Sequence, residues 1–156
     1  MQYKKLTDEI SFDVAEYVKS YLNFHKNQSI NLYLGCDSHN RLKTTYATTL
    51  VFNVGYIGCH VIYKKEMVPI IQDMWTRLWG EAERSVETAL YLRKNGIEID
   101  TIDLDYNINP EFKSHKLVSA AVGYVESLGF KARVKPELLP AVYAVDHLVG
   151  LLKKLS

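Results

Sequence analysis

The sequence is poor in cysteine, and its two cysteines, Cys36 and Cys59, belong to no spaced motif. Two are too few for a disulfide framework or a zinc cage. Because both lie in apolar segments, we expect reduced thiols buried in the core. No apolar run approaches the roughly 20 residues that cross a bilayer, and residues 1–13 lack the apolar stretch of a secretion signal. We therefore expect a cytoplasmic protein without a membrane partner.

An excess of charge of one sign is also missing. The 19 Lys and Arg residues and 18 Asp and Glu residues leave a net charge of +1, so the chain has no overall basic field that would attract nucleic acid. Small basic clusters do occur, at 41–43, 64–65 and 131–135. A nucleic-acid partner would therefore depend on local charge.

What is present is the composition of one ordinary domain. A length of 156 residues, with 47% hydrophobic and 24% charged residues, is enough to bury a sizeable core. We see no internal repeat or linker, and we predict a single domain over 1–156. It would consist of an N-terminal helix at about 7–24 and a core at about 30–154.

The patterning of apolar residues predicts the order βββαβαβα after the N-terminal helix. The expected strands are 30–36, 44–52, 56–63, 97–104 and 130–134. The expected core helices are 69–95, 109–129 and a last one after Pro140. Three successive strands followed by two strand–helix crossovers imply an α/β fold with a five-stranded mixed sheet and helices on both faces.

Four acidic residues fall where this topology would gather them. Asp37 closes the first expected strand and Asp105 the fourth, while Glu81 lies in the long helix and Asp146 in the last helix. Ligand sites in open α/β sheets form outside the carboxyl ends of the strands. Clustered carboxylates repel one another unless they are protonated or bind metal. A pair of Mg²⁺ ions, which prefer oxygen ligands, would neutralise such a cluster.

Each of these acids also has a purely structural interpretation. Asp37 could be a turn residue that leaves its strand, and Asp105 could cap the turn that follows it. Asp103 precedes Asp105 on the same strand face and is an alternative to it as the acid that this strand contributes to the site. Glu81 could be a solvated helix residue, whereas Asp146 lies at the edge of an apolar stripe. Their joint placement favours a metal site.

The element order, with acids at these four points, resembles the ribonuclease H-like superfamily over nearly the whole chain after residue 30. Four segments resemble more closely the YkuK family of predicted ribonuclease H-related proteins. They are LGCDSH at 34–39, RLWGEAERSVETA at 77–89, DLDYN at 103–107 and KPELLPAVYAVDHL at 135–148. The last of them also resembles the A-x-x-A-D-x-L signature of Holliday-junction resolvases.

The resemblance implies that Asp37 bridges two metal ions, with Asp105 and Asp146 completing their ligands. The resemblance also implies a metal-binding glutamate in the long helix, and Glu81, Glu83 and Glu87 are all candidates for it. In the superfamily, core residues follow the metal-binding glutamate one, four, five and eight positions later. From Glu81 these positions hold Ala82, Ser85, Val86 and Ala89, which fit, whereas from Glu83 they hold Arg84, Glu87, Thr88 and Tyr91, which do not. Glu81 is therefore the preferred candidate for the metal-binding glutamate.

The implied activity is hydrolysis of phosphodiester bonds in nucleic acid, with Mg²⁺ or Mn²⁺ held by Asp37, Glu81, Asp105 and Asp146. Basic groups such as Lys43 or Lys135 would hold the phosphate backbone. The form of nucleic acid and the oligomeric state are not set by the sequence.

Two other interpretations share this fold. The alternative is a non-catalytic module that binds nucleic acid or another protein, because a fold does not imply a function. An ATPase of the actin-like class needs two such domains and glycine-rich phosphate loops, which 156 residues with 8 glycines do not supply.

Overall fold

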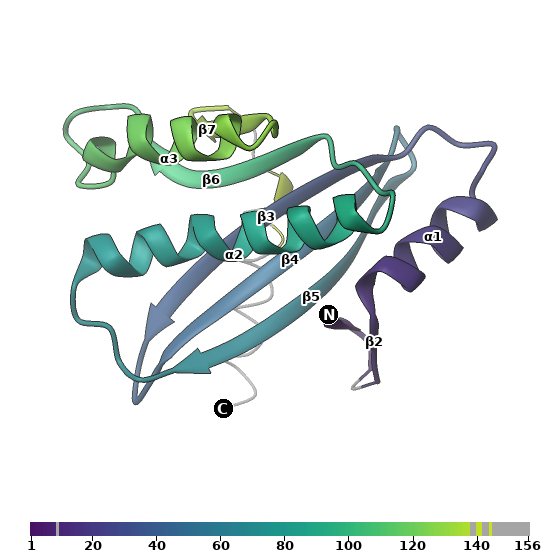
Figure 1. Ribbon diagram of the computed structural model, residues 1–156, viewed down its shortest axis with the longest axis horizontal. Helices are drawn as coiled ribbons and strands as arrows, with labels where there is room; N and C mark the ends of the chain where they lie inside the picture. Colours follow the sequence, from purple (N-terminus) through teal and green to yellow (C-terminus); the bar gives the residue numbers. More distant parts are fainter. Residues whose placement is uncertain (9, 138–139, 142–143, 145–156) are drawn as a thin grey trace.

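The computed structural model describes residues 1–8, 10–137, 140, 141 and 144, which form a mixed sheet with helices packed on it (Figure 1). In this part of the chain the sheet has seven strands in the order β2-β1-β5-β4-β3-β6-β7. The strands are β1 (Gln2–Lys5), β2 (Ser11–Asp13), β3 (Asn31–Asn40), β4 (Thr44–Val54), β5 (Gly58–Val68), β6 (Thr101–Asn107) and β7 (Ala132–Lys135). The helices are α1 (Val14–Phe24), α2 (Met74–Lys94) and α3 (His115–Ser127).

The predicted core order is confirmed from β3 to β7, which run βββαβαβ along the chain. The predicted last helix lies outside the described residues, as does Asp146. Figure 1 shows α2 and α3 on the same side of the sheet, where both contribute to the main core. Val86 and Ala89 of α2 pack there with Leu34 and Ile102 of the central strands.

The prediction of five strands with a helix at 7–24 was wrong at the N-terminus. Residues before Val14 form two short strands, and β1 adds to the edge of the sheet by pairing with β5. The helix begins later because Asp13 is its N-cap, whose carboxylate accepts hydrogen bonds from Ala15 N and Glu16 N. The side chain of Tyr3 is fully buried, which fixes the face of β1 that turns inward.

The starts of α2 and α3 and the position of β6 are among the other boundaries that differ from the prediction. Helix α2 begins behind Asp73, which accepts a hydrogen bond from Thr76 N, and not at Pro69. Helix α3 begins behind Ser114, since Asn109 forms a tight turn and accepts a hydrogen bond from Glu111 N. Strand β6 runs over 101–107, later than the expected 97–104, because Ile97 still hydrogen-bonds to Leu92 at the end of α2.

The register of β3 and β6 positions the acidic residues. These strands are parallel neighbours, with Tyr33 opposite Thr101 and Gly35 opposite Asp103. Two residues further along both strands, the same register places Asp37 level with Asp105. Alternate residues of a strand share a face, so both acids lie on the face opposite the one that α2 and α3 cover.

Two sequence-based expectations about exposure can be compared with the fold. None of the described helices is long and apolar enough to cross a membrane. Cys36 is buried as expected, but Cys59 is exposed at the start of β5, so its expected place in the core was wrong.

Candidate functional site

Asp37 lies within a strand and not at its end. Strand β3 continues to Asn40 because its pairing with β4 persists, from Asp37 opposite Ala47 to Asn40 opposite Thr44. The predicted position at the strand end was therefore wrong, and so was the turn interpretation. The half-buried carboxylate accepts a hydrogen bond from Ser38 N at 2.7 Å.

Glu81 is buried on α2, with 3% of its surface exposed, which contradicts its interpretation as a solvated residue. Its Oε1 accepts a hydrogen bond from the Ser38 hydroxyl at 2.5 Å. Its Oε2 is also buried and has no hydrogen-bond partner among the described residues. Such an oxygen is costly unless a proton or a cation compensates it.

The pKa of Glu81 is raised well above its ordinary value. Burial is the main cause, followed by the negative charge of Asp37, and the charge of Asp105 acts in the same direction. The hydrogen bond from Ser38 and the charge of Arg77 oppose this shift. Asp37 and Asp105 are therefore both close enough to Glu81 to affect its carboxylate electrostatically.

The other two candidate glutamates of α2 lie at the surface. Glu83 is exposed and accepts a hydrogen bond from Trp79 Nε1 at 3.1 Å. Glu87 is exposed and its Oε2 lies 3.5 Å from Lys64 Nζ. Of the three glutamates that the sequence left open, Glu81 alone is directed into the interior.

Ser38 and Arg77 join Asp37 to Glu81, and sequence reasoning gave neither of them a role. The Ser38 side chain points away from that of Asp37 and toward α2, as alternation along a strand requires. Arg77 Nη1 donates to the Ser38 hydroxyl at 2.9 Å and to the Ser38 carbonyl at 3.0 Å. The signal that could have found Arg77 is its spacing, four residues before Glu81 on one helix face.

Asp105 and Asp103 differ in their surroundings, although both lie inside β6 and not at its end. Asp105 is half-buried and forms an ion pair with Lys135 of β7. Asp103 is 1% exposed, and its two oxygens accept hydrogen bonds from Arg133 Nε at 2.8 Å and from Ala141 N at 3.0 Å. Burial raises the pKa of Asp103, while those hydrogen bonds and the charge of Arg133 lower it. Asp103 thus has structural partners on both oxygens, and Asp105 is the acid level with Asp37.

The described residues do not by themselves form a complete metal site. No group of three or more His, Cys, Asp or Glu side chains within them is arranged to hold a metal ion. The fourth predicted ligand, Asp146, lies outside this part of the chain. What fits a cation is the buried Oε2 of Glu81, which has no hydrogen-bond partner among the described residues.

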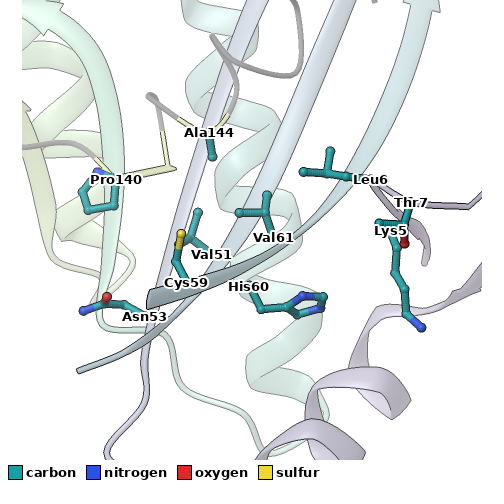
Figure 2. Close-up of a pocket in the computed structure, with 10 residues that line it drawn as sticks. All are labelled: Lys5, Leu6, Thr7, Val51, Asn53, Cys59, His60, Val61, Pro140 and Ala144. Carbon is teal, nitrogen blue, oxygen red and sulfur yellow. The ribbon is translucent and has the colours of Figure 1, made fainter. Parts of the chain in front are cut away.

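A separate pocket of about 690 Å³ lies at the other end of the strands (Figure 2). Its lining is mainly apolar and includes Val51, Val61 and Pro140. Val51 pairs with Tyr33, four residues before Asp37 on β3, so this pocket is not part of the acidic site. Its polar lining consists of Lys5, Thr7, Asn53, Cys59 and His60.

Comparison with known proteins gives one match. Residues 13–148 match the family model described as Ribonuclease H-like. This range includes most of the chain and all four predicted acids. No curated protein and no solved structure matches the chain.

Proposed function

The chain belongs to the ribonuclease H-like family, and we propose that it hydrolyses phosphodiester bonds of nucleic acid with divalent metal ions. Within that family, the segments around Asp37, Glu81 and Asp105 favour the YkuK type. The observation that carries the proposal is the carboxylate of Glu81. One of its oxygens has no partner among the described residues, and its pKa is raised by burial first, then by the charge of Asp37, with Asp105 acting in the same direction.

A divalent cation would give the buried oxygen of Glu81 a partner without protonation of the acids. Asp37, Glu81 and Asp105 would hold it, with Asp146 as a further ligand. Carboxylate oxygens are the ligands that Mg²⁺ and Mn²⁺ prefer. When bound, two such ions lower the pKa of an attacking water and stabilise the leaving oxygen of a phosphodiester.

The chain's own residues would prepare the acids for this role. Ser38 and Arg77 fix one oxygen of Glu81, so the other keeps a defined direction. Lys135 holds a positive charge beside Asp105, where a phosphate group would arrive. It was predicted to contact phosphate directly, and its ion pair with Asp105 places it at the acids themselves.

The proposal is tested by cleavage of RNA, DNA, hybrid and junction oligonucleotides with Mn²⁺ or Mg²⁺. Asp37→Asn should reduce cleavage to the level seen in EDTA, because it removes the proposed bridging ligand. The control is Glu126→Gln, which neutralises an exposed acid on α3. Circular dichroism would verify that both variants fold. Wild-type cleavage by Asp37→Asn would refute the proposal.

A second candidate, a non-catalytic binding module on the same fold, is favoured by one observation. Asp105 and Asp103 already have cationic partners, Lys135 and Arg133. If these ion pairs replace a metal, adding Mg²⁺ or Mn²⁺ should not raise the melting temperature. A site that binds metal should gain stability as the metal concentration rises.

We also propose a cytoplasmic location. Cys36 and Cys59 are both free thiols, and Cys59 is exposed. An exposed free thiol suits a compartment that keeps cysteines reduced.

A further inference from the structure

The loop between β6 and α3, residues 108–114, exposes apolar side chains beside the acidic site. Ile108 is 49% exposed and Phe112 is 52% exposed. The loop directly follows β6, the strand that carries Asp105, and Figure 1 shows it at the left end of the sheet, with α1 at the right. Loops held by a rigid scaffold are where ligand contacts concentrate, so this half-exposed aromatic ring is well placed to meet a substrate.

The base of the loop adjoins the acids. Asn107 lies two residues beyond Asp105 on β6, so their side chains share a face of the sheet. In the strand register, Asn107 is also the partner of Lys135, whose ammonium group forms the ion pair with Asp105. A nucleic-acid strand whose phosphodiester meets the acids would therefore pass this loop.

Hydrogen bonds within the loop hold it in one shape. The backbone N–H of Asn107 donates to the Ser114 hydroxyl at 3.1 Å, which ties the two ends of the loop together. Asn109 Oδ1 accepts a hydrogen bond from Glu111 N at 3.1 Å, and the Asn109 carbonyl accepts one from Phe112 N at 3.1 Å. Because the backbone at Phe112 is fixed before a ligand arrives, binding there costs less ordering entropy.

Positive charge surrounds the exposed ring. Lys113 and the first-turn residue Lys116 of α3 are both exposed, and neither forms an ion pair with a side chain in the described part of the chain. The acidic residue of the loop is Glu111, whose Oε2 accepts a hydrogen bond from Asn109 Nδ2 at 3.3 Å. Proteins that bind single-stranded nucleic acid combine aromatic rings, on which bases stack, with cations that attract the backbone.

We propose that this loop binds an unpaired base of the nucleic acid, which stacks on the ring of Phe112 while Lys113 and Lys116 attract the neighbouring phosphates. This inference rests on the proposed function for its choice of ligand, and it names substrates with unpaired nucleotides beside the bond that is cleaved. Within a duplex the neighbouring bases already cover both faces of each base. The loop positions the strand and takes no part in bond cleavage.

The test is fluorescence anisotropy of two labelled DNA strands of equal length in EDTA, so that neither metal nor cleavage contributes. One strand is oligothymidine, and the other has the same backbone without bases. The wild type should bind the thymidine strand more tightly, because only that strand can stack. Phe112→Leu keeps an apolar side chain but removes the ring, so affinity for the thymidine strand should fall at least about fivefold. Affinity for the abasic strand should change little.

The matched control is Phe24→Leu, which removes a ring that is 84% exposed at the end of α1. It should bind both strands as the wild type does. Phe112→Trp keeps an aromatic ring and should retain the preference for the thymidine strand. The double variant Lys113→Gln/Lys116→Gln should weaken binding of both strands and lower the slope of log K against log salt by about 1.4.

Equal affinity of Phe112→Leu and Phe24→Leu for the thymidine strand would overturn the inference. So would a wild type that binds the two strands equally or binds neither. An unchanged salt slope in the double lysine variant would overturn the role given to the two lysines. These outcomes are separate from the test of the proposed function. Cleavage that depends on Asp37 can persist when Phe112 is irrelevant, and base-dependent binding in EDTA can persist when no cleavage occurs.

Discussion

The Ser38 hydroxyl donates a hydrogen bond of 2.5 Å to Glu81 Oε1, which ties the residue after Asp37 to a buried carboxylate on α2. The hydroxyl in turn accepts a hydrogen bond from Arg77. The orientation of Glu81 therefore depends on a side chain that belongs to the sheet.

Ser38→Ala should destabilise the fold by about 1–3 kcal/mol, because it leaves a second oxygen of Glu81 buried without a donor. The measurement is urea unfolding at pH 7. Ser85→Ala is the matched control, since Ser85 is equally buried but donates to the backbone carbonyl of Glu81 at 3.2 Å. Ser85→Ala should lower the free energy of unfolding by no more than about 1 kcal/mol. Equal losses in both variants would contradict the role given to Ser38.

Glu81 should make stability depend on pH. Burial, and then the charge of Asp37, raise the pKa of Glu81 in the folded state above its unfolded value. The folded state therefore binds more protons between these two values, and the free energy of unfolding falls as pH rises through that window.

Glu81→Gln removes this titration. The unfolding free energy of the wild type, measured relative to the variant in EDTA, should fall by up to about 1.4 kcal/mol per pH unit above pH 5. Urea unfolding at pH 5, 6 and 7 provides the measurement. If the two proteins show parallel curves, Glu81 does not titrate in this range.

Gly80 allows α2 to approach β4 beside the site. A Cβ atom at Gly80 would lie 2.5 Å from the hydroxyl oxygen of Tyr46 and 3.0 Å from its Cζ. Tyr46 cannot easily move, because it is 1% exposed and Arg84 stacks on its ring at 3.6 Å. Gly80→Ala should therefore cost about 1–3 kcal/mol through overpacking.

The control is Gly123→Ala in α3, where a Cβ would meet no atom within 4 Å. It should be neutral or stabilise the protein by up to about 1 kcal/mol, because alanine has the higher helix propensity. Thermal and urea unfolding would measure both variants. A Gly80→Ala protein as stable as the Gly123→Ala protein would show that Tyr46 relaxes freely.

Part of the acidic site could be predicted from local patterns. The phase of the apolar residues on α2 indicated which glutamate faces inward, and Glu81 is buried while Glu83 and Glu87 are exposed. Helical periodicity contains this information because residues three and four apart share a face. The choice between Asp103 and Asp105 had no such basis, since residues two apart on a strand face the same way. Arg133, Ala141 and Lys135 separate their environments, and all three are distant in sequence.

The sequence by itself determined the order of the core strands and helices, the family, and the phase of α2. These depend on periodicity and on short segments, which are properties of neighbouring residues. Tertiary structure alone decided the pairing of β1 with β5, the register that sets Asp37 level with Asp105, and the contact between Ser38 and Glu81. Such contacts join residues far apart in the chain. Their geometry follows from how the sheet and α2 pack, and no local pattern encodes it.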